Sequence, residues 1–511
     1  MMRSAVLTAA LLLPCQALCE LAHTNESSQA WPTKEWRTST PEEQGMGSAA
    51  LAKLVDYGAT HELESMLIVR HGAIVAEAYY APFRAGVKHR MNSATKSVIG
   101  TLVAIALKEG RLSSTDQRAV DFFADRTIAN LDDRKRAITI QNLLDMTSGL
   151  SWTEPLGDGR PQSMIAMERS ADWTQFVLDQ PMTDGPGTTF NYSSGNPHLL
   201  SAILTKTTGE SALDYARERL FGPLGISDVF WRQDPQGVSI GGFGLFLQPR
   251  DMAKLGYLWL RNGVWDGAEI IPQAWIDRIR HATIPMGIAN LRYGNLFWVD
   301  PDSGVFYANG FHGQRIFVAP ALDVVAVATA TGFSASGSAM IGMIADAVKS
   351  DGPLPPDVAS QSLLASRIRE AATEKPLPVG QTPDIAKTIS GKVFRFADNP
   401  LRLDSLTLTL DGPNPSYAYA FKPARPDSAA ERFEGPIGLD GLYRTGSPRP
   451  EGTIPAAKGG WSYDGSFVVQ FEDLGGDNLR RAFLSFKGEG VDLVLVPENG
   501  YSIKLHGEAA D

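Results

Sequence analysis

The 511-residue sequence contains only 2 cysteines, Cys15 and Cys19, and both lie close to its N-terminus. So few cysteines exclude a disulfide scaffold, an iron–sulfur protein and a cysteine-rich zinc protein. Basic residues are also in the minority, because 47 Lys+Arg stand against 57 Asp+Glu, a formal net charge of −10. Nucleic-acid binders usually present a basic surface, so this balance argues against nucleic acid as a partner.

Long hydrophobic runs are absent as well. No apolar stretch reaches the ~18 residues that a membrane span needs, so no stable span is expected. The run Ala5–Leu13 is short, follows Arg3 and precedes small residues, which is the pattern of a secretory signal peptide. We therefore expect a signal peptide over residues 1–19, cut after Cys19, and an exported protein that is periplasmic or secreted. An uncleaved N-terminal anchor is the alternative.

Several common catalytic motifs are missing. The segment His61-Glu62-Leu63-Glu64 lacks the second histidine of a zinc helix motif. Neither a Gly-x-Ser-x-Gly elbow nor a phosphate-binding loop ending in Gly-Lys-Ser/Thr occurs in the chain. No metal site and no cofactor are therefore expected, and the sequence says nothing about the oligomeric state.

Hydrophobic periodicity divides the rest of the chain into four parts. A leader over residues 20–44, loosely packed from Thr24 to Gln44, precedes a main domain over residues 45–350, a linker with a helix over 351–390 and a β-domain over 391–511. Within the main domain, the pattern predicts helices over 45–60, 91–110, 251–262 and 339–349, and strands over 65–70, 73–80, 295–299, 305–309, 315–319 and 324–329. This order predicts an α+β sandwich whose sheet is built from both ends of the domain, with a helical subdomain between them. The C-terminal part reads as an all-β barrel or sandwich.

Ser93 and Lys96 are the first candidates for chemistry. They lie three residues apart at the start of the predicted helix 91–110, so they share one helix face, close to unpaired backbone N–H groups. A lysine beside a serine hydroxyl can take its proton, and Ser-x-x-Lys is the nucleophile motif of penicillin-interacting serine enzymes. The alternative is a plain helix cap with a solvated lysine.

Tyr192 is the candidate for proton transfer. It lies on a loop, in Tyr192-Ser193-Ser194, ahead of an apolar-periodic run. A lysine ammonium nearby is expected to favour the phenolate, which could then exchange a proton with Ser93. Tyr293, in Tyr293-Gly294-Asn295, is the rival, but it adjoins an aromatic strand where packing is the more common role.

The third candidate segment is Gly310–Arg315, just before an apolar strand. Its glycines allow a substrate to lie close to the backbone. The N–H of Gln314 could pair with that of Ser93 as an oxyanion hole. His312 is either a substrate contact or a loop histidine that pairs locally.

Together these three segments resemble the three conserved boxes of the serine β-lactamase/penicillin-binding superfamily. The likeness is strongest to class C β-lactamase-related hydrolases, including carboxylesterases, D-amino-acid peptidases and 6-aminohexanoate-dimer hydrolases, and it covers about residues 40–350. It rests also on the intervening segments Met146–Trp152, Gly241–Leu245, Pro249–Gly256 and Gly313–Pro320. The resemblance implies a β-lactamase-like sandwich with an antiparallel sheet. It also implies an acyl-enzyme on Ser93, with Lys96 and Tyr192 as proton-transfer partners and Ser194, His312, Gly313 and Gln314 around the substrate.

Two positions depart from true β-lactamases. Phe311-His312 replaces the usual Lys-Thr of the third box, and Ser194 replaces the Asn of the second box. The cation and hydroxyl that hold a penicillin carboxylate are then missing, and an unpaired buried carboxylate is costly. We therefore expect a hydrolase of small-molecule esters or amides. A β-lactamase or D,D-peptidase, and a sensor that is acylated without turnover, are the alternatives.

Overall fold

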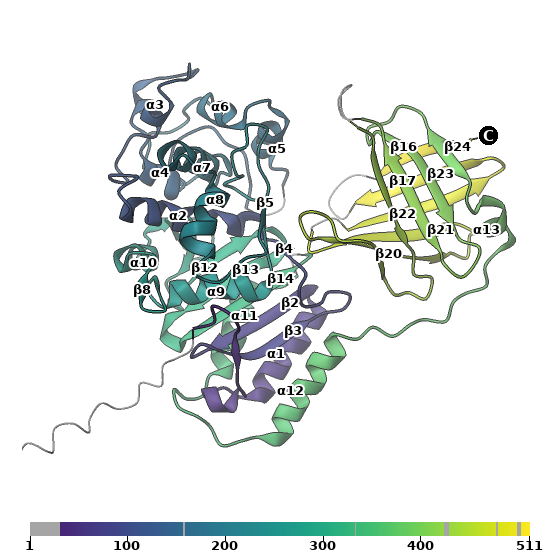
Figure 1. Ribbon diagram of the computed structural model, residues 1–511, viewed down its shortest axis with the longest axis horizontal. Helices are drawn as coiled ribbons and strands as arrows, with labels where there is room; N and C mark the ends of the chain where they lie inside the picture. Colours follow the sequence, from purple (N-terminus) through teal and green to yellow (C-terminus); the bar gives the residue numbers. More distant parts are fainter. Residues whose placement is uncertain are drawn as a thin grey trace, which may run out of the picture.

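The computed structural model describes residues 31–156, 159–332, 334–423, 429–476, 479–497 and 502–510. The chain forms a sheet covered by helices, a helical subdomain and a separate C-terminal β-domain (Figure 1). Both the α+β sandwich and the all-β C-terminal part predicted from the sequence are confirmed.

The central sheet has nine strands in the order β1-β3-β2-β14-β13-β12-β11-β10-β9. All neighbours are antiparallel except β1 and β3, which run parallel. The strands are β1 (Arg37–Thr38), β2 (Leu63–Arg70), β3 (Ala73–Tyr79), β9 (Ile284–Pro285), β10 (Arg292–Gly294), β11 (Phe297–Asp300), β12 (Val305–Gly310), β13 (Gln314–Ala319) and β14 (Val324–Ala330). The two ends of the main domain thus build one sheet, as predicted.

Helices cover both faces of this sheet. Ile316 and Phe317 are neighbours on β13. A Cβ added to Gly337 would lie near Phe317, whereas one added to Gly256 would lie near Ile316. Since adjacent residues of a strand point to opposite faces, the helices that carry these glycines cover opposite faces. One face is covered by α1 (Ser48–Thr60), α11 (Gly337–Ala347) and α12 (Val358–Ala371), and the other by α2 (Thr95–Lys108) and α9 (Pro249–Leu260).

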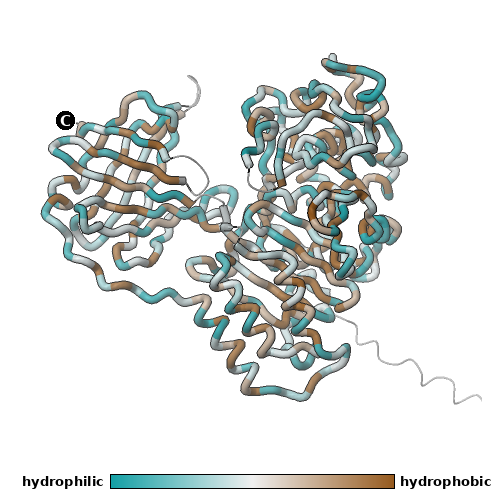
Figure 2. Tube along the Cα trace, turned by 180° about the vertical axis from the view of Figure 1, so that it is seen from behind, coloured by the Kyte–Doolittle hydropathy of each residue, from teal (hydrophilic) through white to brown (hydrophobic). Residues whose placement is uncertain are grey.

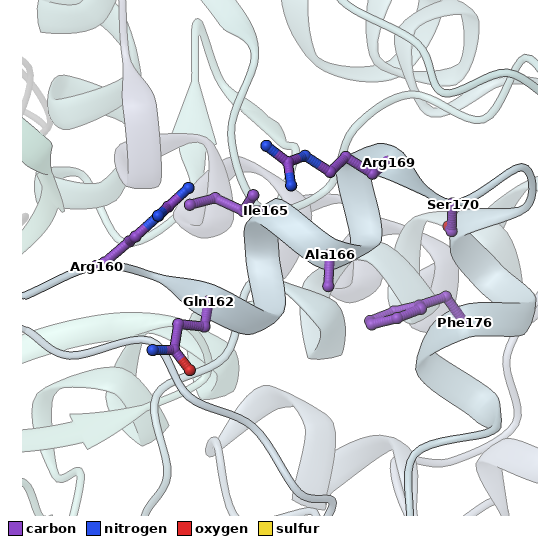
Figure 3. Close-up of a pocket in the computed structure, with 7 residues that line it drawn as sticks. All are labelled: Arg160, Gln162, Ile165, Ala166, Arg169, Ser170 and Phe176. Carbon is purple, nitrogen blue, oxygen red and sulfur yellow. The ribbon is translucent and has the colours of Figure 1, made fainter. Parts of the chain in front are cut away.

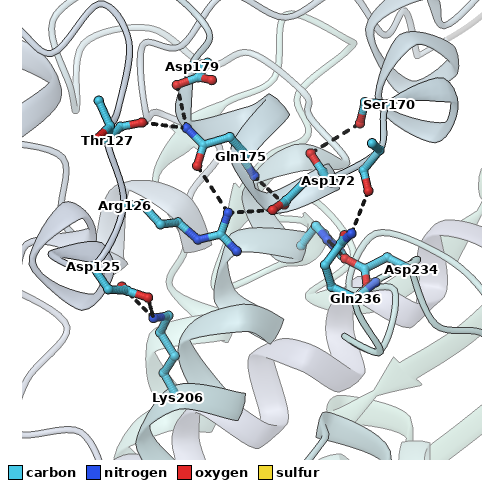
Figure 4. A network of polar contacts seen from close by, with 12 residues as sticks. Asp125, Arg126, Thr127, Ser170, Asp172, Gln175, Asp179, Lys206, Asp234 and Gln236 are labelled. Carbon is cyan, nitrogen blue, oxygen red and sulfur yellow. Dashed lines mark hydrogen bonds and ion pairs between the residues drawn. The ribbon is translucent and has the colours of Figure 1, made fainter.

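The helical subdomain lies between β3 and β9 in the chain. Its helices are α3 (Asp133–Arg136), α4 (Ile140–Leu144), α5 (Gln162–Arg169), α6 (Trp173–Leu178), α7 (Gly195–Thr208) and α8 (Ala212–Ala216), followed later by α10 (Gln273–Arg280). A polar network links α6 and α7 to neighbouring loops (Figure 4), and in it Arg126 donates to Asp172 at 2.7 Å and Lys206 to Asp125 at 2.7 Å. Within it, His198 and Asp234 form a fully buried pair at 3.1 Å. These contacts fix the subdomain that carries the loop before α7.

The C-terminal β-domain is one ten-stranded antiparallel sheet. Its order is β18-β17-β16-β15-β24-β23-β22-β21-β20-β19, and β18 approaches β19 and β20, so the sheet curls until it is nearly closed. The strands are β15 (Val393–Phe396), β16 (Leu403–Thr409), β17 (Ser416–Phe421), β18 (Glu431–Pro436), β19 (Arg444–Thr445), β20 (Ile454–Trp461), β21 (Phe467–Leu474), β22 (Arg480–Lys487), β23 (Gly490–Pro497) and β24 (Ile503–Ala509), preceded by α13 (Asp384–Ile389). Figure 2 shows hydrophobic stretches of the chain gathered in the strands of both sheets.

The two domains contact each other through a small apolar cluster. Phe83 and Val87 of the main domain pack with Ile454, Ala456 and Leu474 of the β-domain. Next to this cluster the Arg90 N–H donates to the Gly475 carbonyl at 2.7 Å. The β-domain therefore holds the segment that leads to Ser93.

Two details differ from the sequence predictions. Residues 31–44 are not loosely packed, because Trp36 is buried beside the sheet and β1 pairs with β3. The strand predicted over 295–299 begins at Phe297, since Asn295 and Leu296 have φ angles of 50° and 68°, which no strand residue adopts. The predicted signal peptide lies outside the described residues, and the domain boundaries stay predictions. No helix in the described ranges is long and apolar enough to cross a membrane.

Candidate active site

Ser93 lies in a short helical turn, Asn92–Ala94, that runs directly into α2. The strand β4 (His89–Arg90) before it pairs with β6 (Leu245–Leu247), and the Met91 N–H donates to the Leu245 carbonyl at 2.8 Å. These bonds fix the approach to the helix, so Ser93 is presented at its N-terminal end while its side chain stays half-buried. The helical placement predicted for Ser93 and Lys96 is confirmed.

Lys96 is the centre of the polar contacts. Its ammonium donates to Ser93 Oγ at 2.9 Å, to Ser194 Oγ at 2.9 Å and to the Gly242 carbonyl at 2.8 Å. The side chain is only 1% exposed. The alternative of a solvated lysine beside a helix cap is therefore wrong.

Burial changes the acidity of this lysine. Removal from water lowers the pKa of Lys96 to about 8, although the negative charge of Glu154 acts in the opposite direction. A lysine with such a pKa is partly neutral near pH 8 and can accept a proton there, which an ordinary surface lysine cannot.

Tyr192 lies against the same lysine. The Lys96 ammonium is 4.7 Å from the centroid of the Tyr192 ring, and a side-chain hydrogen bond joins Tyr192 to Ser93. Burial, together with the charge of Glu154, raises the pKa of Tyr192 above its ordinary value. The expectation that Lys96 favours a Tyr192 phenolate is therefore wrong: the group is a neutral phenol.

Tyr293, the rival candidate, lies behind Tyr192. The two rings meet edge-on with centroids 6.3 Å apart, and Trp298 lies 6.4 Å from both. Tyr293 is 1% exposed, and its β10 backbone pairs with β11. The described contacts of Tyr293 are thus those of a packed side chain that supports Tyr192.

Glu154 is the residue that sequence reasoning missed. Its carboxylate accepts from Ser194 N–H at 2.7 Å, from Ser194 Oγ at 2.6 Å and from the Trp152 indole at 2.7 Å. Ser194 Oγ therefore accepts from Lys96 and donates to Glu154, which links the two charges. Glu154 lies two residues beyond the segment Met146–Trp152, and its distance from Ser194 along the chain gives no signal of the contact.

Glycines allow the backbone segments of the site to approach each other. A Cβ on Gly242 would lie 2.7 Å from Ser194 Cβ, and one on Gly241 would lie 2.0 Å from the Pro197 carbonyl oxygen. Only glycine fits so close to the start of α7. This approach brings the Gly242 carbonyl within reach of Lys96.

The third predicted segment lies beside Ser93. Asn92 Nδ2 donates to the Phe311 carbonyl at 3.2 Å, and a Cβ on Gly310 would be 2.2 Å from the Met91 carbonyl oxygen and 3.2 Å from Ala94 N. The Gln314 side chain is buried and donates to the Ala330 carbonyl at 2.6 Å, which anchors the start of β13 to the end of β14.

His312 and Gly313 occupy the turn between β12 and β13. His312 is 2% exposed, its φ is 61°, and its ring lies 4.1 Å from that of Phe311, which is 46% exposed. Gly313 also has a positive φ, 87°. The turn therefore presents Phe311, and not a cation, at the surface.

A surface hollow of about 540 Å³ lies near the Glu154 loop (Figure 3). Arg160, Arg169 and Phe176 contribute to its walls, and Phe176 packs edge-on against Trp152 at 6.4 Å. Within the described ranges, no group of three or more His, Cys, Asp or Glu side chains could hold a metal ion.

A match to known sequences accompanies this geometry. Residues 49–349, more than half of the chain, match the family described as Beta-lactamase. The chain belongs to the beta-lactamase family. The serine, lysine and tyrosine of the site all lie within the matched range, and the C-terminal β-domain lies outside it.

Relatives in the beta-lactamase family include hydrolases and penicillin-binding proteins. The 6-aminohexanoate-dimer hydrolase of Paenarthrobacter ureafaciens is 25% identical over 286 residues, which cover 52% of this chain and 71% of the relative. Penicillin-binding protein 4 of Amycolatopsis lactamdurans is 34% identical over 186 residues, 36% of this chain and 44% of the relative. The structure of EstCE1, a hydrolase with promiscuous acyltransferase activity, superposes with a TM-score of 0.50 at 20% identity, covering 59% of this chain and 99% of EstCE1. This likeness supports the fold.

Proposed function

We propose that this beta-lactamase-family hydrolase cleaves ester or amide bonds of small molecules through an acyl-enzyme on Ser93. One observation carries the proposal: Lys96 Nζ lies 2.9 Å from Ser93 Oγ in a buried position that lowers the pKa of Lys96 to about 8. The naming of a relative as a 6-aminohexanoate-dimer hydrolase and of EstCE1 as a hydrolase with acyltransferase activity supports the same bond classes.

The contacts of Lys96 suit a general base. A neutral lysine keeps two N–H bonds and one lone pair. The Gly242 carbonyl and Ser194 Oγ, at 2.8 and 2.9 Å, accept the two N–H bonds. The lone pair is then directed at Ser93, whose proton it takes as Oγ attacks the substrate carbonyl.

Tyr192 completes the proton path. As a neutral phenol bonded to Ser93, it can donate a proton to the leaving group and recover one from Lys96. The backbone N–H groups of Ser93 and Gln314 would stabilise the oxyanion. Water then attacks the acyl-enzyme along the same path in reverse, releasing the acid and restoring Ser93.

The turn between β12 and β13, which carries Phe311 and His312, disfavours β-lactams as substrates. Phe311 and His312 stand where a true β-lactamase has a cation and a hydroxyl, and Glu154 adds a negative charge near Ser194. A substrate carboxylate gains no cationic partner from either feature. Esters and amides without such a carboxylate are therefore the preferred substrates.

One assay separates the candidate functions. The enzyme is mixed with p-nitrophenyl butyrate, a chromogenic cephalosporin and a linear 6-aminohexanoate dimer. We expect turnover of the ester or the amide that is lost in Ser93→Ala and kept in Ser113→Ala, a control at an exposed serine. Rapid cephalosporin hydrolysis would favour a β-lactamase, and a burst without turnover would favour a sensor; either result contradicts the proposal.

The tyrosine assignment has its own comparison. Tyr192→Phe should lower kcat/KM for the ester by roughly 10²-fold or more, the usual effect of removing a general acid–base group. Tyr293→Phe should leave kcat/KM within a few-fold. The reverse pattern would assign the proton transfer to Tyr293.

We also propose that the protein is exported, on the strength of the signal-like pattern of residues 1–19. Fusion of residues 1–44 to a phosphatase that is active only outside the cytoplasm should give activity. Replacing Leu11 and Leu12 with arginine should abolish it, and an inactive parent fusion would contradict export.

A further inference from the structure

The β-domain meets the main domain at the strand that leads into the turn carrying Ser93 (Figure 1). This strand, β4, lies at the edge of a three-stranded sheet, where it pairs with β6. The Met91 N–H points to β6, and since the N–H groups of successive strand residues alternate between the two sides, the Arg90 N–H points away from β6. The Gly475 carbonyl accepts that N–H at 2.7 Å. The β-domain therefore supplies a backbone acceptor to the outer edge of β4.

The same contact is a close approach of two backbones. A Cβ added to Gly475 would lie 2.0 Å from the Lys88 carbonyl oxygen, and the φ of Gly475 is 82°, so a side chain there would force one of the backbones to move. A second glycine, Gly452, lies over the Lys88 side chain, with an added Cβ 2.1 Å from Cε. The Lys88 ammonium is ion-paired to Asp228 of the main domain. The segment that ends in β4 is thus held between the two domains.

Two residues separate this contact from Ser93, and both are fixed. Met91 is 0% exposed, and its N–H donates to the Leu245 carbonyl. Asn92 has a φ of 47°, and its side chain donates to the Phe311 carbonyl at 3.2 Å. A displacement of β4 is therefore passed on to Ser93 and is not absorbed between them.

Arg90 also contacts the segment that holds Lys96. Its guanidinium lies 5.9 Å from the centroid of the Phe243 ring, within the range of cation–π contacts. The neighbouring Gly242 carbonyl accepts from Lys96 at 2.8 Å. Movement of Arg90 therefore acts on both partners of the 2.9 Å contact between Lys96 Nζ and Ser93 Oγ.

We propose that the β-domain positions the catalytic serine: Gly475 acts through β4 to hold Ser93 at the distance from Lys96 that proton transfer needs. The proposal rests on the proposed function, in which Ser93 is the nucleophile and Lys96 its base. A misplacement of about 1 Å caused far from the chemistry can lower a rate by about 10²-fold, so a small movement of β4 is enough. Gly475 is a positioning residue, because it acts through β4 and not on a reacting atom.

A matched pair of glycines at the two ends of β21 tests the proposal. Gly465 and Gly475 have nearly equal φ angles, 81° and 82°, so alanine at either position brings the same backbone strain. An added Cβ meets nothing within 4 Å at Gly465, whereas at Gly475 it meets the Lys88 carbonyl oxygen. The measured quantity is the rate at which a fluorophosphonate reacts with the full-length protein, a step in which Ser93 Oγ displaces fluoride from phosphorus and its proton passes to Lys96. Circular dichroism gives the folded fraction, and the rate is expressed per folded chain.

We expect Gly475→Ala to lower this rate at least tenfold and Gly465→Ala to keep it within twofold of the unmodified protein. A merely structural role of Gly475 would change the unfolding midpoint and not the rate per folded chain. An unchanged rate in Gly475→Ala, or an equal loss in both variants, would overturn the proposal. Labelling of Ser93→Ala at the unmodified rate would instead overturn Ser93 as the nucleophile, and with it the proposed function.

A second pair of variants leaves the backbone at Gly475 unchanged and decides the question where Gly475→Ala fails to fold. Leu474 and Leu408 are both 0% exposed, but Leu474 belongs to the apolar cluster between the domains and Leu408 to the core of the β-domain itself. Alanine at either position leaves a cavity and destabilises the protein. Leu474→Ala should lower the rate per folded chain at least threefold, and Leu408→Ala should keep it within twofold. Equal rates in the two leucine variants would overturn the proposal.

Discussion

At the scale of single residues, the site depends on how one buried lysine is charged. Lys96 is surrounded by three acceptors and one carboxylate, Glu154, reached through Ser194. Burial favours the neutral amine and Glu154 favours the ammonium. The balance between these two effects sets the pH at which Lys96 can take a proton.

The first prediction concerns the pH profile of the enzyme. If neutral Lys96 is the base, log(kcat/KM) for an ester should rise with pH and level off above a midpoint near about 8, the pKa of Lys96. Glu154→Gln removes the charge that stabilises the ammonium, so the midpoint should move to lower pH by about one unit. Initial rates from pH 5.5 to 10 measure both curves.

Glu210→Gln is the matched control for this prediction. Glu210 follows the C-terminal end of α7, whose N-terminal end is at the site, so 14 helical residues place it about 20 Å away. The pH profile of kcat/KM for Glu210→Gln should coincide with that of the unmodified enzyme. A profile with no inflection between pH 7 and 9, or a shift to higher pH in Glu154→Gln, would contradict Lys96 as the base.

Sequence reasoning reached some of these residues and missed others for physical reasons. Ser93 and Lys96 are fixed by helix geometry, so their spacing alone predicts that they meet. Glu154 meets Ser194 only because a loop without regular structure folds back, and no periodicity records that contact. The neutral state of Tyr192 depends on its burial, which spacing does not report.

At the scale of elements, a close contact between a strand end and a helix start shapes the site. Gly310 ends β12 where the Met91 carbonyl oxygen would lie only 2.2 Å from an added Cβ. Real side chains do not tolerate such a distance, so β12 or the turn Asn92–Ala94 would have to move. The oxyanion donor proposed at Ser93 lies on this turn, and the one proposed at Gln314 begins β13, where Gln314 pairs with Gly310.

The second prediction is that Gly310→Ala damages both stability and catalysis. Overpacking of this kind costs about 1–3 kcal/mol in the free energy of unfolding. The accompanying shift should lower kcat more than it raises KM, because it separates donors needed in the transition state. Denaturant unfolding measures the change in the free energy of unfolding, and steady-state kinetics measure the changes in kcat and KM.

Gly342→Ala is the control. Gly342 lies within α11, and an added Cβ there meets nothing within 4 Å. Since alanine is a better helix former than glycine, this variant should be slightly more stable and fully active. Wild-type activity in Gly310→Ala would show that the contact does not position the site.

The sequence predicts the regular elements of the fold better than it predicts contacts between distant segments. Strands of the central sheet are continuous apolar runs such as β14, which periodicity identifies well. Residues 31–44 are polar and contain prolines, so they resemble a leader, yet Trp36 and β1 pack on the sheet. Tertiary contacts of this kind are invisible to local pattern.

At the scale of the whole molecule, the β-domain is tied to the segment that leads into Ser93. The contact is small and apolar, centred on Val87 and Leu474, and is extended by the bond from Arg90 N–H to the Gly475 carbonyl. An interface of this size resembles a transient protein–protein contact more than a domain core. One buried charge should therefore be enough to separate the domains.

The last prediction is that Leu474→Glu releases the β-domain without unfolding it. Leu474 is 0% exposed, and an unpaired carboxylate at its position costs several kcal/mol while the domains remain in contact. The mostly exposed segment 373–382 should then be cleaved faster by a nonspecific protease, giving two folded fragments, and the radius of gyration in X-ray scattering should increase. Gln470→Glu, on the same face of β21 but outside the apolar cluster, should behave like the unmodified protein. If Leu474→Glu is cleaved at the wild-type rate with unchanged scattering, Leu474 does not hold the domains together. If it is cleaved throughout the β-domain, the residue stabilises that domain's own fold instead.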